Sequence, residues 1–163
     1  MFNVGDKIVY PNQGVGIVDF IEEREFKGKV QSYYKIHLLN DTMQLMLPFS
    51  RVEKSNIRLV SDEEIIDYKL KHINEFTMDM DELNSYNFKE RAIINSEKLK
   101  SGTLMDYIEV VSNLTKLKDY NKLNTNEKQI LDSTKKVLIE EISQSKDISN
   151  SEATSLLDDS MNS

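Results

Sequence analysis

Cysteine and tryptophan are both absent from this chain of 163 residues, and it contains only 2 prolines and 5 glycines. Without cysteine, the chain cannot form a disulfide framework, a thiolate zinc site or a cysteine nucleophile. No apolar run approaches the roughly 18 residues of a membrane span. The N-terminal residues 1–6 lack the basic and apolar regions of a signal peptide. We therefore expect a cytoplasmic location and no contact with membranes.

Charge is unevenly distributed along the chain, which has a net charge of −7. Residues 1–60 carry 8 basic and 7 acidic side chains, and residues 86–142 carry 10 and 9. Residues 61–85 carry 2 and 8, and residues 143–163 carry 1 and 4. The acidity is thus concentrated in a connecting stretch and the tail. The two nearly neutral parts could contact nucleic acid, but such contact would be weak and local.

The first 60 residues have the pattern of short strands joined by tight turns. Pro11 and Pro48 end two of the expected strands, and Gly28 can supply positive φ in a hairpin turn at 26–29. We expect strands at 7–10, 15–25, 31–39, 43–47 and 57–60. Five short strands in this length predict a small, strongly bent barrel of the SH3-like or Tudor-like class.

From Ser61 onward the pattern becomes helical. Helix start signals, in which a polar cap precedes an acid by three residues, occur at Ser61, Asn87, Thr103, Asn124 and Ser149. They predict helices near 62–75, 88–100, 104–119, 125–143 and 150–159. We therefore expect an α+β protein with a β domain at 1–60 and a compact helical bundle at 61–160. Residues 75–86 are expected to be an acidic linker, and the serine-rich tail 144–163 to be partly flexible.

The residue patterns of enzymes and metal sites are missing. His37 and His72 have no local ligand partners, and no nucleophile, base and oxyanion site can be assembled. Asp79 and Asp81 with Glu90 resemble the ends of a calcium loop, but the ligand and glycine required between them are absent. We expect no enzymatic activity, no metal and no cofactor.

A possible nucleic-acid contact lies at the expected helix start near residue 88. Phe88 could insert between bases, while Lys89 and Arg91 could contact phosphates beside it. Lys98 and Lys100, further along the same helix, could contact phosphates as well. DNA binding by these few cations should be weak, independent of sequence and sensitive to salt.

A purely structural interpretation of the same segment is also open. Tyr86 precedes the expected cap and could pack on Ala92 or Ile93 one turn later, which would form a hydrophobic staple. In that case the aromatic residues would stabilise the helix and would not contact DNA.

The order of these features resembles the CarD/CdnL family of bacterial transcription regulators that bind RNA polymerase. The similarity covers nearly the whole chain and is most specific at the opening, Phe2-x-Val4-Gly5-Asp6-x-Ile8-Val9-Tyr10-Pro11-x-x-Gly14. Further matching segments are Ile21-Glu22-x-Arg24, Lys27-Gly28, Pro48, Asn87-Phe88, Asn95-x-Glu97-Lys98-Leu99-x-Ser101-Gly102, Glu109-Val110-Val111-x-x-Leu114 and Leu123-x-x-x-Glu127-Lys128-x-x-Leu131. The N-terminal part also resembles the polymerase-binding domain of transcription-repair coupling factor.

This resemblance implies a mechanism. Family members dock a Tudor-like domain on the β subunit of RNA polymerase, and their helical domain reaches the upstream edge of the transcription bubble. There a tryptophan enters the minor groove at the −10 element and hinders reannealing, which stabilises the open promoter complex. The resemblance also implies a monomer that associates with the nucleoid through polymerase.

Two residues depart from the family pattern. Phe88 occupies the position of the tryptophan, and it is smaller and lacks the indole N–H. Met46 occupies a strand position at which the family often has a basic residue for polymerase, whereas Arg24 keeps the other basic contact. The alternative function is an adaptor that binds polymerase or another protein without contacting DNA.

Overall fold

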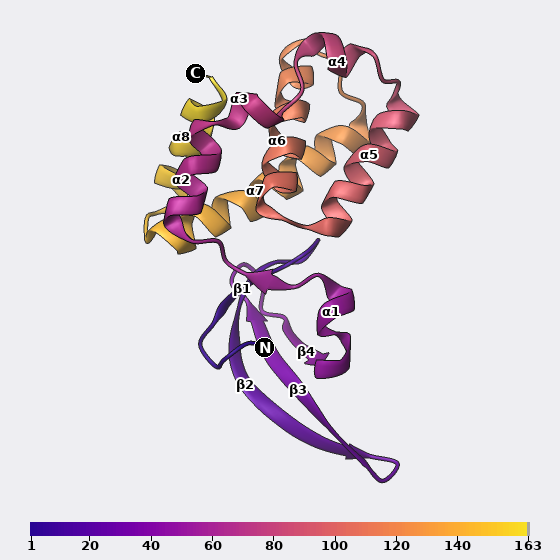
Figure 1. Cartoon of the computed structure of the whole chain (residues 1–163), viewed down its shortest axis with the longest axis vertical. Coiled ribbons are helices and arrows are strands. Elements are labelled where there is room, and N and C mark those ends of the chain that lie inside the picture. The colour runs from indigo at the N-terminus through magenta and orange to yellow at the C-terminus, as the bar shows by residue number, and fades with distance from the viewer. Residues whose placement is uncertain (163) are drawn as a thin grey trace. The chain divides into compact units, whose positions relative to one another are not determined.

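The computed structural model describes residues 1–162 of the chain (Figure 1). Its contacts divide the chain into two compact units, Met1–Val60 and Ser61–Ser163. The first unit contains all the strands, and the second is helical. The expected α+β class is confirmed.

The first unit is built on a five-stranded antiparallel sheet with the strand order β4-β3-β2-β1-β5. The strands are β1 (Lys7–Tyr10), β2 (Gly14–Phe26), β3 (Lys29–Leu38), β4 (Gln44–Pro48) and β5 (Arg58–Leu59). All five lie within about two residues of the predicted ranges. The sheet is strongly bent, but β4 and β5 are its two edges, so the barrel is not closed by hydrogen bonds.

Two glycines in the sheet meet different local requirements. Lys27 and Gly28 both have positive φ, at 52° and 77°, as a two-residue hairpin turn between β2 and β3 requires. The predicted turn at 26–29 is therefore confirmed. At Gly16 the constraint is space, because a Cβ atom would lie 2.8 Å from the carbonyl oxygen of His37 and from Ile36.

The core of the β unit is formed by alternating residues on one face of the sheet. Tyr34 lies at its centre, stacked on Phe49 with ring centroids 4.2 Å apart. Phe49 belongs to η1 (Phe49–Arg51), which leads into α1 (Val52–Ser55), and neither was predicted from the sequence. The buried core residues are Ile8, Val18, Tyr34, Ile36, Leu47 and Ile57.

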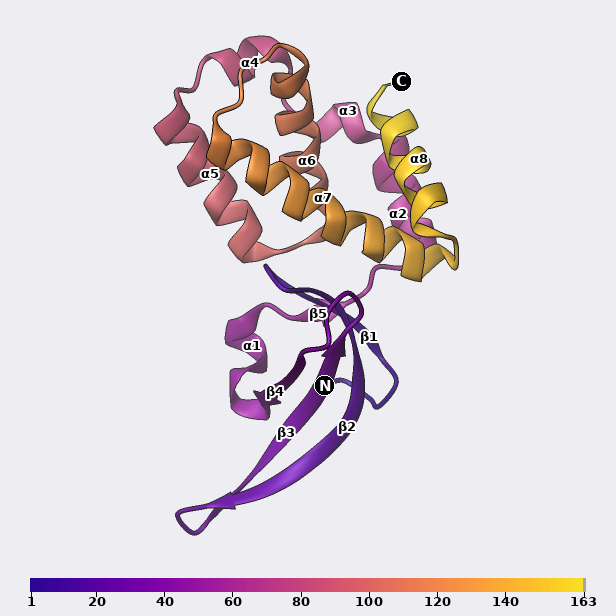
Figure 2. The same cartoon turned by 180° about the vertical axis from the view of Figure 1, so that it is seen from behind.

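The β2–β3 hairpin extends beyond the rest of the sheet as a curved two-stranded arm (Figures 1 and 2). Strand β1 pairs with β2 only as far as Ile17, and Val18 is bonded to the chain before β1. Among the described residues, β2 from Phe20 to Phe26 therefore pairs with β3 alone. This stretch, here called the open β2 edge, has backbone groups available to another strand.

The second unit contains seven helices within the described residues. They are α2 (Glu63–Lys71), α3 (Ile73–Phe76), α4 (Met80–Asn84), α5 (Phe88–Ser101), α6 (Leu104–Asp119), α7 (Thr125–Lys146) and α8 (Asn150–Met161). Four predicted caps, Asn87, Thr103, Asn124 and Ser149, accept a hydrogen bond from the backbone three residues later. The predicted cap at Ser61 is wrong, because α2 begins after Asp62 without a side-chain cap.

The stretch expected to be an acidic linker instead packs into the helical unit. Asp79 caps the unpredicted helix α4, and Leu83 on that helix is buried. The backbone of Met78 donates to Asn113 Oδ1 at 3.0 Å and accepts from Lys116 Nζ at 2.7 Å. The linker prediction for 75–86 is therefore wrong, because two residues of α6 bind this stretch directly.

The serine-rich tail is also structured. It continues α7 as far as Lys146 and then forms α8, on which Ala153 and Leu157 are fully buried. These two apolar residues are one turn apart and face inward, so the serines occupy the remaining faces of the helix. The prediction of a partly flexible tail at 144–163 is corrected for residues 144–161.

None of the helices in the described part of the chain has the length and apolar character needed to cross a membrane.

Candidate nucleic-acid interface

Phe88 is the first residue of α5, and its side chain is 52% exposed. The helix start is held by a reciprocal capping box in which Asn87 and Glu90 each bind the other's backbone, at 2.9 and 3.1 Å. The exposed ring is therefore attached to a fixed backbone. Phe88 is therefore not a core residue, and its role as a wedge stays a prediction.

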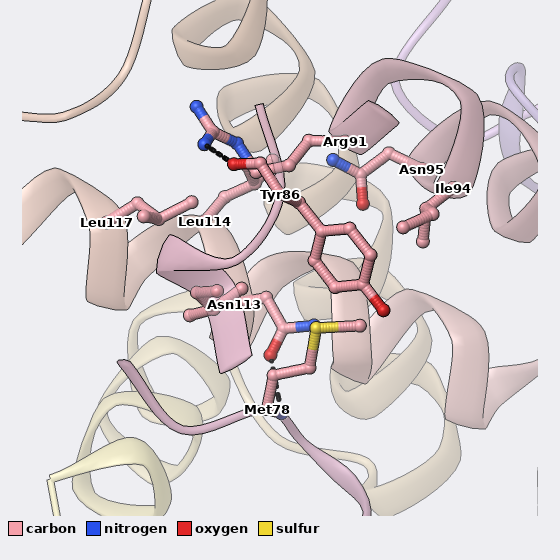
Figure 3. Close-up of a pocket in the computed structure, with 9 residues that line it drawn as sticks. Met78, Tyr86, Arg91, Ile94, Asn95, Asn113, Leu114 and Leu117 are labelled. Carbon is pink, nitrogen blue, oxygen red and sulfur yellow. Dashed lines mark hydrogen bonds between the residues drawn. The ribbon is translucent and has the colours of Figure 1, made fainter. Parts of the chain in front are cut away.

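Tyr86 precedes the cap and lies half-buried beside a small pocket under the α4–α5 connection (Figure 3). The pocket has room for about one water molecule. Its lining residues are Met78, Leu83, Tyr86, Arg91, Ile94, Asn95, Asn113, Leu114 and Leu117. The expected staple partners Ala92 and Ile93 are exposed instead. The staple interpretation is wrong in its partners, although Tyr86 is indeed packed inward.

Arg91 does not extend into solvent as expected for a phosphate contact. Its Nε and Nη2 atoms donate to the two carboxylate oxygens of Glu127 at 2.9 and 3.0 Å, and Nη1 donates to the carbonyl of Tyr86 at 3.2 Å. The Arg91 side chain is 10% exposed and that of Glu127 is 4% exposed. All the guanidinium nitrogens are thus engaged inside the helical unit, and we withdraw Arg91 from the expected phosphate contacts.

Lys98 is likewise engaged within the helical unit. It forms an ion pair with Glu109 of α6, and its side chain is only 20% exposed. Arg91, Asn95 and Lys98 follow the spacing of one helix face, and that face packs inward. Lys98 is therefore also withdrawn from the expected phosphate contacts.

The opposite face of α5 carries the remaining cations. Lys89, Ile93, Ser96 and Lys100 are all exposed, at a spacing that places them in one stripe along the helix. Phe88 lies at the start of the same helix. Two of the four expected cations, Lys89 and Lys100, are thus accessible to a phosphate backbone.

The expected polymerase-contact residues lie on the outer face of the β-sheet, opposite its core. Arg24 is on the open β2 edge, its side chain is 55% exposed, and Glu22 lies 3.5 Å from its guanidinium. Met46 is half-buried on the edge strand β4. The alternation of the strands places both residues on one face, at different rows of the sheet.

Lys35 also lies on this face and was not predicted from the sequence. It pairs directly with Met46 on one side and Phe20 on the other, and its Nζ lies 5.5 Å from the centre of the Phe20 ring. The face beside Met46 therefore carries a cation supplied by the neighbouring strand. The cross-strand register that places Lys35 there was not available from sequence alone.

The two histidines each lie beside a carboxylate. His37 is 2.7 Å from Asp19, and His72 is 3.0 Å from Glu75. Within residues 1–162, no group of three or more histidine, aspartate or glutamate side chains is arranged to hold a metal ion.

Comparison with protein-family models gives two matches that together cover most of the chain. The CarD-like/TRCF RID domain matches residues 2–61, and the CarD C-terminal domain matches residues 73–158. A curated relative from Bacillus subtilis (strain 168), named "Putative transcription factor YdeB", is 39% identical over 142 residues. These residues cover 87% of this chain and 90% of the relative.

The two domains and their order define a transcription regulator of the type associated with RNA polymerase, which is not an enzyme class. The chain belongs to the CarD family. The RID domain is Tudor-like, so the fold expected for the N-terminal unit is confirmed.

Proposed function

We propose that this protein docks on the β subunit of RNA polymerase and stabilises the open promoter complex by placing Phe88 at the upstream edge of the bubble. The observation that carries this proposal is the exposed Phe88 ring on the first residue of a capped helix. Unstacking a base step costs a few kcal/mol, and an inserted apolar ring fills the space that is opened. Phe88 would thereby slow the collapse of the bubble.

Docking through the β unit is supported by the open β2 edge and the face next to it. An unpaired strand can accept a strand from another protein, with main-chain hydrogen bonds providing affinity and side chains providing specificity. Arg24 lies on this edge. In this proposal Arg24 and Met46 contact polymerase, and Lys35 supplies a cation beside Met46.

The DNA contacts of the proposed complex are few. Lys89 and Lys100 contact phosphates, while Arg91 and Lys98 hold the helical unit together. Two exposed cations give little affinity for free DNA, and this is sufficient because a polymerase-bound protein is already at high effective concentration near the promoter. We propose accordingly that the protein acts as a monomer at the nucleoid.

Footprinting and lifetime measurements on a polymerase–promoter complex test this function. The full chain should extend protection at the upstream edge of the bubble and lengthen the open-complex lifetime, and Phe88→Ala should remove the second effect. The adaptor function predicts polymerase binding with an unchanged footprint and equal lifetimes for both proteins. That result would exclude the proposed DNA contact and support the adaptor function.

A further inference from the structure

Phe88 and Arg91 are in contact as well as being neighbours on α5. The guanidinium carbon of Arg91 lies 4.6 Å from the centre of the Phe88 ring, within the range of a cation–π interaction. One part of the ring thus rests on a charged planar group while half of the side chain remains exposed.

The position of the guanidinium is fixed by the bonds of its nitrogen atoms. Glu127 binds Arg91 with both carboxylate oxygens, and the carbonyl of Tyr86 accepts a third bond. Glu127 is itself held at the start of α7, where it forms a capping box with Asn124 at 2.8 and 3.4 Å. Arg91 is therefore connected to the start of α7 and to the connection before α5.

We propose that Arg91, fixed by Glu127, is a positioning residue that holds the Phe88 ring in one orientation before DNA is bound. A side chain that is already ordered loses less conformational entropy on binding than a mobile one. The consequence for the open complex rests on the proposed function of Phe88, whereas the restriction of the ring is a property of the free protein. The two parts can be tested separately.

The absence of tryptophan makes the first test direct, because Phe88→Trp introduces a single indole at the site. Time-resolved fluorescence anisotropy of this variant reports the local motion of the ring. Adding Arg91→Met should increase the amplitude of the fast local component, and Arg91→Lys should increase it less. Lysine keeps the charge but cannot bind both Glu127 oxygens and Tyr86 in one plane.

Lys98→Met is the matched control. It removes another ion-paired cation from the inward face of α5. Lys98 lies about two turns beyond Arg91 and does not contact residue 88. It should leave the indole motion unchanged. An unchanged fast component in Arg91→Met, or an equal increase in Lys98→Met, would overturn the proposal. If circular dichroism shows that Arg91→Met fails to fold, Arg91→Lys and Glu127→Gln replace it. Each should increase the fast local component, and no increase in either would overturn the proposal.

The second test measures open-complex lifetimes with the full chain and polymerase. Arg91→Lys should shorten the lifetime about two- to fivefold, the scale of one lost cation–π contact. It should have no effect in the Phe88→Ala background. Equal shortening in both backgrounds would show that Arg91 acts by another route and would overturn the positioning role. If Phe88→Ala alone leaves the lifetime unchanged, the proposed function fails, and the anisotropy result still decides whether Arg91 orients the ring.

Discussion

Phe88 and Arg91 lie one turn apart on α5, and their side chains are in contact although one is half-exposed and the other is buried. Both residues were expected to contact DNA, but Arg91 is instead bound to Glu127 inside the helical unit. Substitutions at Phe88 should alter function more than stability, and substitutions at Arg91 should alter both.

Phe88→Ala should lower the free energy of unfolding by less than about 1 kcal/mol, since it removes a half-exposed ring and one cation–π contact. A core phenylalanine would cost about 3–5 kcal/mol. Urea denaturation measures this difference. Phe88→Trp should be tolerated and should maintain or lengthen the open-complex lifetime. A large loss of stability in both variants would show that the ring belongs to the core.

Lys89→Gln and Lys100→Gln should each weaken DNA binding to a similar extent on unrelated sequences. Each should also reduce the slope of log K against log salt by about 1, because one phosphate contact is lost. Fluorescence titrations at several salt concentrations measure the slope. Lys98→Gln is the control on the same helix and should affect stability without changing the slope. Tight, sequence-specific binding by the parent protein would contradict the proposed mode of contact.

Arg24→Glu should weaken binding to the polymerase β subunit while leaving the circular dichroism spectrum unchanged, because the Arg24 side chain is 55% exposed. Lys7→Glu makes the same charge reversal on β1, away from the open β2 edge, and should have little effect. A pull-down or surface-binding assay with polymerase core compares the two. Equal binding by Arg24→Glu and the parent would remove Arg24 from the interface.

Gly16 and Gly28 should respond differently to substitution because their constraints differ. Gly28→Asn should be tolerated, since asparagine adopts positive φ readily and the space around Gly28 is open. Gly16→Ala should cost about 1–3 kcal/mol, as expected for overpacking against backbone. Thermal unfolding of the two variants tests the distinction, and an equally stable Gly16→Ala would show that β3 can shift to make room.

Lys146 predicts a pH dependence within the helical unit. Its hydrogen bond to Asp67 at 2.6 Å, assisted by Glu63, raises the pKa of the Lys146 amine above its usual value of 10.5. Because the pKa is higher in the folded protein, the stabilisation is complete below pH 10.5 and is lost as the pH rises through the folded value. Lys146→Met should cost about 0.5–1 kcal/mol at pH 7. Denaturation curves of parent and variant should converge in strong alkali, and a constant difference would exclude this ion pair as the cause.

Much of the secondary structure could be predicted because its signals are local. Caps such as Asn87 and Asn124 and the turn at Lys27-Gly28 act within three or four residues, and the structure contains each of them. Helix α4 was missed because Asp79 was assigned to an acidic linker once a calcium loop had been rejected, although the same residue can cap a helix.

The site was predicted less well because its contacts are distant in sequence. The carboxylate that binds Arg91 is 36 residues away, and no local pattern identifies it. The spacing of Arg91, Asn95 and Lys98 could have indicated a shared face, but only packing determines that this face is turned inward. The exposure of Phe88 likewise depends on the side of α5 that α6 and α7 cover.

The open β2 edge also determines how the protein behaves toward copies of itself. A long strand edge without a partner favours self-association. This edge, however, carries Glu22, Glu23 and Glu25 around Arg24. In an antiparallel pairing that placed Arg24 opposite its copy, Glu23 would face Glu25 of the other molecule, and like charges would repel. The edge can thus remain available to a partner strand without joining its own copies. Replacement of Glu23 and Glu25 by glutamine removes this repulsion and is the change after which the chain should begin to aggregate.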